Sequence, residues 1–120
     1  MLRILDLQHA AIFQQRLEAR DNVRSLQLSG HKRIAAEQIA GRDLVLPFDI
    51  SWGAGLMRNE PNFFYGPQPD AVGHSGWGGS CAFADATRNL SGAYVMNRQS
   101  TALIGDVRPR ALIEAVYAAL

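Results

Sequence analysis

The chain has 120 residues, 48% of them hydrophobic and 19% charged, so we expect one folded domain with a sizeable core and exclude a disordered chain. Its 12 basic and 11 acidic residues give a net charge of +1 and are spread along the sequence, which argues against nucleic acid and anionic membranes as partners. No stretch approaches the ~18 apolar residues of a membrane span and no targeting segment stands out, so a cytoplasmic location is expected.

The N-terminal third, residues 1–41, is predicted to be helical. Apolar residues recur with a ragged helical period from Leu2 to Ala19. A second helix is predicted from His31 to Ala40, with Ser29 as its N-cap and Gly41 at its C-terminal end.

Strands are predicted over most of residues 42–120. Ser51 to Met57 contains a Trp-Gly-x-Gly pattern that indicates a strand packed closely against neighbouring backbone, with Trp52 in the core. Residues 82–84 and 93–96 are apolar on both sides of each run, which is typical of strands covered on both faces. We therefore expect an interior hairpin.

The chain is predicted to end in a helix from Val107 to Ala119. Asp106 can cap it, and Pro109 fits its first turn. Together the elements predict an α+β fold, an antiparallel sheet with flanking helices. The apolar helix face expected on the sheet consists of Leu112, Ile113, Val116, Tyr117 and Leu120.

Residues 59–71 contain three prolines and a glycine, which exclude regular structure there. The run Phe63-Phe64-Tyr65 within this segment has two interpretations. The three rings could pack over the core, or they could line a substrate site.

The segment from Gly73 to Ser80 is the richest in glycine, with four glycines in eight positions. Glycine allows positive φ and lets a ligand approach the backbone, so a functional edge is one interpretation. A crowded turn that enters a hairpin is the other. A nucleotide-binding loop is excluded because no Gly-Lys-Ser/Thr follows.

From about Ile34 to Leu120 the chain resembles the C-terminal end of the penicillin-recognising serine hydrolases, which include class C β-lactamases, D-alanyl-D-alanine peptidases and related esterases. His74-Ser75-Gly76 stands where that family has its third sequence box, Lys-Thr/Ser-Gly. Residues 80–85 and 90–97 resemble the family's next two strands. The resemblance implies the C-terminal portion of the β-lactamase/transpeptidase-like fold, so that residues 1–120 form a single partial domain.

The resemblance also implies chemistry. In the family an activated serine attacks an ester or amide carbonyl, and an acyl-enzyme is then hydrolysed. By resemblance, His74, Ser75 and Gly76 would bind a small-molecule ester or amide substrate in the intact enzyme, and His74 would act in catalysis. The backbone N–H of Trp77 would be one of two donors to the oxyanion, worth ~3–4 kcal/mol.

Histidine in place of the family's lysine changes the chemistry of the third box. Lysine is a permanent cation suited to a substrate carboxylate, whereas histidine is largely neutral at pH 7 and offers a directional donor or acceptor. His74 therefore favours esters over β-lactams. A turn histidine without a task is the alternative.

Ser29-Gly30-His31-Lys32 matches Ser-x-x-Lys, the family's first box, which carries nucleophile and base. The sequence has no Tyr-x-Asn box, and Ser29 lies much closer to the third box than the family's nucleophile does. We interpret Ser29 as a helix cap, with a nucleophile as the alternative.

We therefore predict the C-terminal wall of a serine hydrolase site that is inactive alone. The competing hypothesis is a non-catalytic remnant, a binding or interaction module that uses Trp77 and the aromatic run. Loss of the family's helical half should also expose apolar surface and favour self-association.

No cofactor and no metal are expected, because His9, His31 and His74 lack ligand spacing and no carboxylate cluster joins them. The single cysteine, Cys81, excludes an internal disulfide and is predicted to be a small buried residue.

Overall fold

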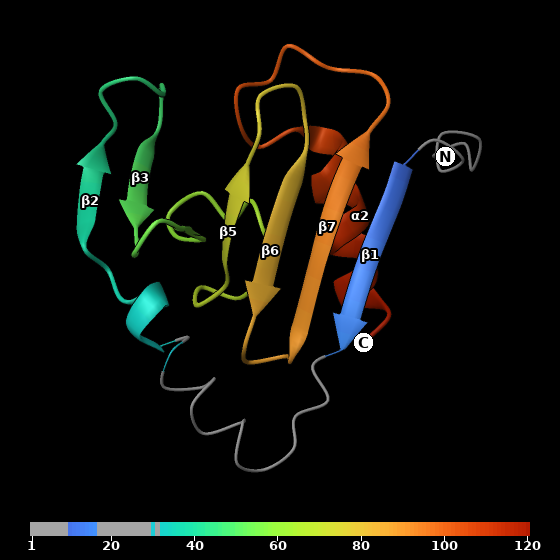
Figure 1. Cartoon of the computed structure of the whole chain (residues 1–120), viewed down its shortest axis with the longest axis horizontal. Coiled ribbons are helices and arrows are strands. Elements are labelled where there is room, and N and C mark those ends of the chain that lie inside the picture. The colour runs from blue at the N-terminus through green and yellow to red at the C-terminus, as the bar shows by residue number, and fades with distance from the viewer. Residues whose placement is uncertain (1–9, 17–29, 31) are drawn as a thin grey trace.

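The computed structural model describes residues 10–16, 30 and 32–120 of the chain. Within these residues, seven strands form one antiparallel sheet in the order β1-β7-β6-β5-β4-β3-β2 (Figure 1). The strands are β1 (Ala10–Arg16), β2 (Ile39–Arg42), β3 (Asp49–Trp52), β4 (Met57–Arg58), β5 (Val72–Ser75), β6 (Cys81–Asp85) and β7 (Leu90–Met96), and the helix is α2 (Val107–Ala118).

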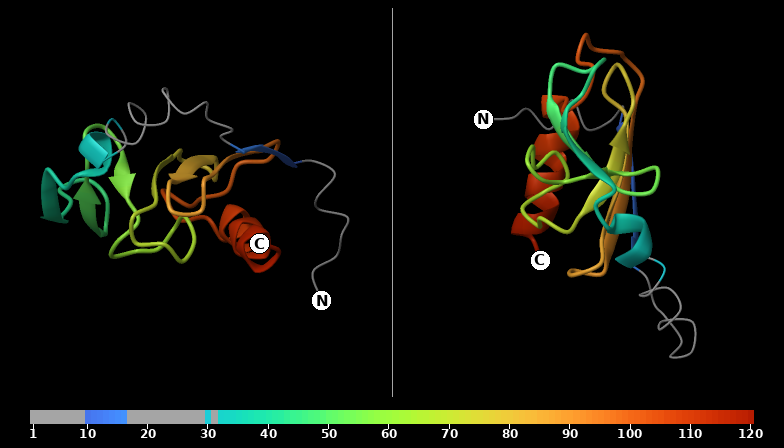
Figure 2. Two further views of the ribbon diagram at one scale, coloured as in Figure 1. Left: turned by 90° about the horizontal axis from the view of Figure 1, so that it is seen from below. Right: turned by 90° about the vertical axis from the view of Figure 1, so that its left-hand side faces the viewer.

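Helix α2 lies against one face of the sheet (Figure 2), and the predicted α+β class is confirmed. Asp106 caps α2 as predicted, because its side chain accepts a hydrogen bond from the Arg108 N–H. Pro109 and Ile113 are the buried residues of α2. Leu120 is the exception to the predicted apolar face, since it lies beyond the end of α2 and is 65% exposed.

Strands β6 and β7 form the predicted hairpin, and both are interior strands of the sheet. Phe83 is buried on the α2 side, whereas Ala82 is exposed and Val95 is 54% exposed. The prediction that both faces of the hairpin are covered is therefore wrong for the described part of the chain.

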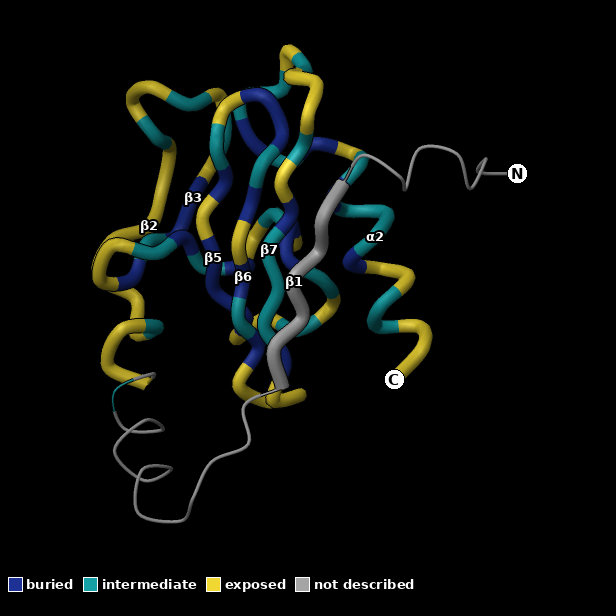
Figure 3. The backbone as a smooth tube through the Cα atoms, turned by 45° about the vertical axis from the view of Figure 1, so that its right-hand side comes forward, coloured by how far each residue is buried: buried dark blue, intermediate teal, exposed yellow. Residues whose placement is uncertain are grey.

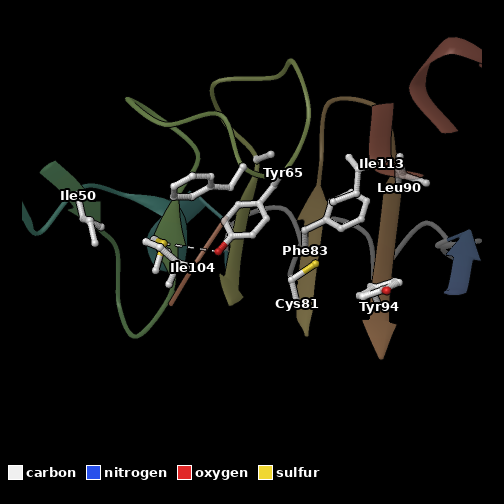
Figure 4. Packing of buried hydrophobic residues seen from close by; sticks show 11 residues of the cluster. Ile50, Tyr65, Cys81, Phe83, Leu90, Tyr94, Ile104 and Ile113 are labelled. Carbon is white, nitrogen blue, oxygen red and sulfur yellow. Dashed lines mark hydrogen bonds between the residues drawn. The ribbon is translucent and has the colours of Figure 1, made fainter. Parts of the chain in front are cut away.

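The core lies between the sheet and α2 and extends beneath the segment that follows β4 (Figure 4). Phe64 and Tyr65 enter it from that segment and are 8% and 1% exposed. Phe64 packs edge-on against Phe48, with ring centroids 5.7 Å apart. Packing over the core is therefore confirmed for Phe64 and Tyr65, while Phe63 is 40% exposed.

Asn59 organises the segment that carries these rings. It is fully buried, and its amide nitrogen donates to the carbonyls of Gly66 at 2.7 Å and Gln68 at 2.8 Å. Its amide oxygen accepts from the Tyr65 N–H at 2.8 Å. These bonds hold the irregular segment in one shape, and they place the Tyr65 ring so close to Gly73 that a Cβ there would lie 2.9 Å from it.

The predicted N-terminal helices are largely overturned. Residues 10–16 form β1, which pairs antiparallel with β7, so the helix predicted from Leu2 to Ala19 is wrong there, and its other residues lie outside the described ones. Pairing with the open edge of β7 satisfies this backbone, and tertiary pairing overrides a weak helical period.

The second predicted helix is also wrong over its C-terminal part. Residues 32–35 are helical, but Ile39 begins β2, and Gly41 lies inside that strand with φ +142°. Ile34 and Ile39 are 43% and 68% exposed, so they form no buried face. The cap predicted at Ser29 lies outside the described residues.

The segment predicted as one strand from Ser51 to Met57 is a hairpin. β3 ends at Trp52, and β4 begins at Met57 after a turn closed by the Gly53 N–H on the Leu56 carbonyl at 2.8 Å. Close packing is confirmed at Gly53, where a Cβ would collide with the Ile34 carbonyl. Trp52 is half-buried and packs against the core, as predicted.

All of β2 is exposed (Figure 3). Leu44 and Val45, in the turn between β2 and β3, are 100% and 88% exposed. No helix among the described residues is long and apolar enough to cross a bilayer.

Replacement of Tyr117 by phenylalanine tests how α2 is fixed to the β6–β7 turn. The Tyr117 hydroxyl donates to the Asp85 carboxylate at 2.5 Å, and Asp85 is 1% exposed, so its loss leaves a buried carboxylate with fewer donors. We expect Tyr117→Phe to lower the free energy of unfolding by about 1–3 kcal/mol in urea titrations.

Tyr94→Phe is the matched control, because the described residues offer the Tyr94 hydroxyl no hydrogen-bond partner, and we expect a change within about 0.5 kcal/mol. Equal effects of the two substitutions would contradict a specific role for the bond to Asp85.

Candidate active-site wall

Strand β5 carries the third box and has an edge that is only half paired. On one side it pairs with β6 over its whole length, with His74 opposite Ala82 and Ser75 opposite Cys81. On the other side β4 reaches only Val72 and Gly73. The backbone from His74 onward therefore has an edge that no described strand covers.

His74 lies on the outer face of the sheet and is exposed, as a substrate-facing role requires. Its Nδ1 lies 3.1 Å from the Ser75 carbonyl oxygen, and its ring packs against Trp52 with centroids 5.9 Å apart. Because a carbonyl oxygen only accepts, this bond places the proton on Nδ1. In the tautomer with its single proton on Nδ1, Nε2 is an acceptor, whereas lysine at this position could only donate.

Ser75 points the opposite way, into the core. It is 9% exposed, and its hydroxyl lies 3.1 Å from the Tyr65 hydroxyl, which also donates to the Met57 sulfur at 3.5 Å. Burial raises the pKa of Tyr65 to about 12, so this tyrosine stays protonated near neutral pH and is no base for Ser75. The sequence thus grouped His74 and Ser75 at one substrate site, but the structure places their side chains on opposite faces.

A tight turn follows the box. The Gly76 N–H donates to the Ser80 carbonyl at 2.8 Å, and the Gly79 N–H donates back to the Gly76 carbonyl at 3.3 Å. Gly78, third in this turn, has φ +96°, which is the arrangement of a type II turn with Trp77 in second place. The glycine-rich segment is therefore both a turn into the β5–β6 hairpin and the end of an open edge.

Trp77 combines an exposed ring with an unused donor. Its side chain is 73% exposed. Its backbone N–H has no acceptor among the described residues, although the neighbouring Gly78 N–H donates to the Ala102 carbonyl at 3.0 Å. A backbone donor beside an open strand edge is accessible to an acceptor that approaches that edge.

No activated nucleophile accompanies this wall among the described residues. Ser51 is 4% exposed and donates to the Glu37 carboxylate at 2.9 Å, within an ion pair of Glu37 and Arg58. Burial raises the pKa of the Cys81 thiol to about 11, so it stays protonated. Lys32 is exposed, and Ser29 lies outside the described residues.

The sequence did not reveal which residues hold the turn in place. Arg108 donates to the Gly78 carbonyl at 2.9 Å and forms a two-pronged ion pair with Asp106. Asp106 was predicted only as a helix cap. An Asp-x-Arg spacing at a helix start has no distinguishing signature, and the contact spans 30 positions, so the sequence offered no signal for it.

Residues 4–117 match the protein family described as Beta-lactamase. The chain belongs to the β-lactamase family. Two solved structures share its fold: a penicillin-binding protein homologue from Caulobacter crescentus (69% identity, TM-score 0.76) and a family VIII carboxylesterase (41% identity, TM-score 0.72).

The two matches cover 78% and 77% of this chain but only 25% of each relative, so the chain spans about a quarter of their length. No curated protein matches it. The β-lactamase-family membership confirms the predicted serine hydrolase family, and the chain has a fragment of the β-lactamase/penicillin-binding-protein-like fold.

The protonation of Asp106 gives a test of the turn's support. Hydrogen bonds from the Arg108 side chain lower the pKa of Asp106 from 3.8 to about 2, against the opposing effect of burial. A lowered folded-state pKa contributes stability above the unfolded-state pKa and loses it as the pH falls through the folded-state value.

We therefore expect the difference in unfolding free energy between the natural chain and Asp106→Asn to be constant from about pH 7 to about pH 5. Between about pH 4 and about pH 2 it should shrink by roughly 1–2 kcal/mol, as measured by urea unfolding followed by tryptophan fluorescence. A difference that does not vary with pH would contradict an ionised, stabilising Asp106.

Proposed function

We propose that this chain supplies the third-box strand and the oxyanion-hole wall of a β-lactamase-like serine hydrolase, which cleaves a small ester or amide through an acyl-enzyme. The observation that carries the proposal is the unpaired Trp77 N–H at the end of β5, beyond the reach of β4. In an acyl transfer such a donor stabilises the charge that develops on the carbonyl oxygen.

His74 supports an ester substrate over a β-lactam. Its Nδ1 is engaged by the Ser75 carbonyl, which leaves Nε2 as an acceptor on the outer face. An acceptor can take a hydrogen bond from a hydroxyl group of the enzyme or substrate, but it offers no fixed cation to a carboxylate. The carboxylesterase among the similar structures agrees with this preference.

Two roles in the proposal fall to backbone rather than side chains. The Ser75 hydroxyl is taken up by Tyr65 in the core, so its substrate-binding role passes to its main chain at the open edge. At Gly76 a Cβ would meet the Ser80 hydroxyl, so glycine keeps the turn closed while its bare backbone faces an acyl group.

The nucleophile and its base would come from outside the described residues. Ser75 and Ser51 are buried, and the hydroxyl of each takes part in a hydrogen bond. Cys81 stays protonated because burial raises the pKa of its thiol. None of the three is therefore ready to attack a carbonyl. The other oxyanion donor in this chemistry is the amide of the nucleophile itself. The described residues therefore supply only part of the site.

The 120-residue chain alone should hydrolyse neither nitrocefin nor p-nitrophenyl butyrate, and a fluorophosphonate probe should not label it. Both expectations follow because Ser51 and Ser75 are held in hydrogen bonds and no described serine has an activating base. Stoichiometric labelling that disappears in Ser29→Ala would contradict this and identify Ser29 as a nucleophile.

The oxyanion role can be tested in a chimera in which this chain's residues replace the matching segment of the family VIII carboxylesterase. Trp77→Pro removes the N–H but suits the second position of a type II turn, so the turn should survive. We expect kcat for p-nitrophenyl butyrate to fall about 10²- to 10³-fold.

Trp77→Phe is the matched control, because it alters the ring and keeps the amide, and kcat should stay within about threefold. A Trp77→Pro chimera as active as the Trp77→Phe chimera would refute the oxyanion role. It would leave the exposed Trp77 ring as a binding surface, the alternative function.

A further inference from the structure

The turn that carries Trp77 is fixed by a segment that lies far from it in sequence. Both main-chain groups of Gly78 are used, since its N–H donates to the Ala102 carbonyl at 3.0 Å and its carbonyl accepts from the Ser100 N–H at 2.9 Å. The two peptide planes that follow Trp77 are thus pinned, and only the dihedral angles of Trp77 itself separate them from its N–H.

Arg108, in the first turn of α2, adds a third anchor. Its Nη2 donates to the Gly78 carbonyl at 2.9 Å, and its Nη1 donates to the Arg98 carbonyl at 2.7 Å. One planar guanidinium therefore joins α2, the turn and the segment after β7. Lysine has no such fork and could satisfy only part of this set.

Asp106 holds the guanidinium in this position. Its carboxylate accepts from the Arg108 Nε at 3.0 Å and Nη2 at 2.9 Å, caps α2 through the Arg108 N–H at 2.9 Å, and also accepts from the Ser100 hydroxyl. Asp106 is 5% exposed, so the carboxylate end of this set of bonds is shielded from water, whereas the Arg108 side chain is 35% exposed. The two-pronged geometry of the ion pair fixes the orientation of the guanidinium.

The turn is shaped to fit this support. Gly79 has φ +118°, and a Cβ built there would collide with the Arg108 Nη2 and lie 2.7 Å from the Asp106 Oδ2. The absence of a side chain at Gly79 therefore lets the ion pair reach the turn. A residue with a side chain at position 79 would displace Arg108 or Asp106.

We propose that Arg108, oriented by Asp106, is a positioning residue that sets the direction of the Trp77 N–H by clamping the Gly78 carbonyl. The inference rests on the proposed oxyanion role of Trp77. If it is right, a substitution that weakens the bond from Arg108 to the Gly78 carbonyl should make the Trp77 amide more mobile while α2 stays stable.

The first experiment uses the full chain and ¹⁵N NMR. Arg108→Lys keeps the charge but loses the fork, so we expect amide exchange of Gly78 and Ser100 to accelerate at least about tenfold and the Trp77 amide order parameter to fall from about 0.85 to below about 0.6. Exchange in the middle of α2 should be unchanged.

Arg110→Lys is the matched control, because Arg110 also lies at the start of α2 but its guanidinium has no partner among the described residues. Ser100→Ala removes one bond to Asp106 and spares Arg108, so it should give a smaller change in the same direction and replaces Arg108→Lys if that variant does not fold. Unchanged Trp77 and Gly78 amides would overturn the proposal.

The second experiment is a double-substitution cycle in the carboxylesterase chimera. With Trp77 intact, Arg108→Lys should lower kcat about tenfold with little change in KM, whereas in a Trp77→Pro background it should have no further effect. Losses that multiply independently would overturn the positioning role. A Trp77→Pro variant that keeps full activity would instead refute the proposed function, and the NMR result would be unaffected.

Discussion

The short pairing between β4 and β5 is the constraint on which the candidate site depends. β4 contributes two residues to the ladder and then turns away, so β5 continues past it with one edge unpaired. Had β4 been longer, hydrogen bonds would have occupied that edge. Instead the Trp77 N–H has no acceptor among the described residues, and His74 packs against Trp52 on the outer face.

The two faces of β5 have different tasks: one packs in the core, and the other carries the candidate site. On the core face the Ser75 hydroxyl meets Tyr65, whose position is set by the buried amide of Asn59. On the outer face His74 is exposed, and the turn beyond it is held by Arg108 and Asp106 from the start of α2. Helix α2 therefore has two roles: its middle covers the core, and its first turn supports the segment that carries the donor.

The sequence predicted those parts of the fold in which local patterns and tertiary contacts agree. The β6–β7 hairpin, α2 with its Asp106 cap and the turn within Gly73 to Ser80 all have short-range signals, namely apolar runs, a capping residue and a cluster of glycines. Residues 10–16 were misassigned because a weak helical period competes with pairing to β7, a partner some 80 positions away that no local pattern reveals.

The sequence predicted where the candidate site lies along the chain, but not how its side chains are arranged. The box identified β5 and Trp77, and strand alternation alone puts His74 and Ser75 on opposite faces, but which of the two faces the core depends on packing that the sequence does not state. The hydrogen bond from Arg108 to Gly78 joins residues 30 positions apart and uses a main-chain carbonyl. Every residue type has that carbonyl, so the sequence at position 78 gives no sign of the bond. Side-chain chemistry that acts on main-chain atoms leaves little trace in a sequence.

The central claim is that the Trp77 amide faces the carbonyl oxygen under attack. A crystal structure of the carboxylesterase chimera trapped with a p-nitrophenyl phosphonate tests it most directly. The claim predicts a phosphonyl oxygen about 2.7–3.1 Å from the Trp77 nitrogen, within hydrogen-bond distance of a donor that points at it. A phosphonyl oxygen bound by other donors, with the Trp77 N–H directed away from it, would contradict the claim.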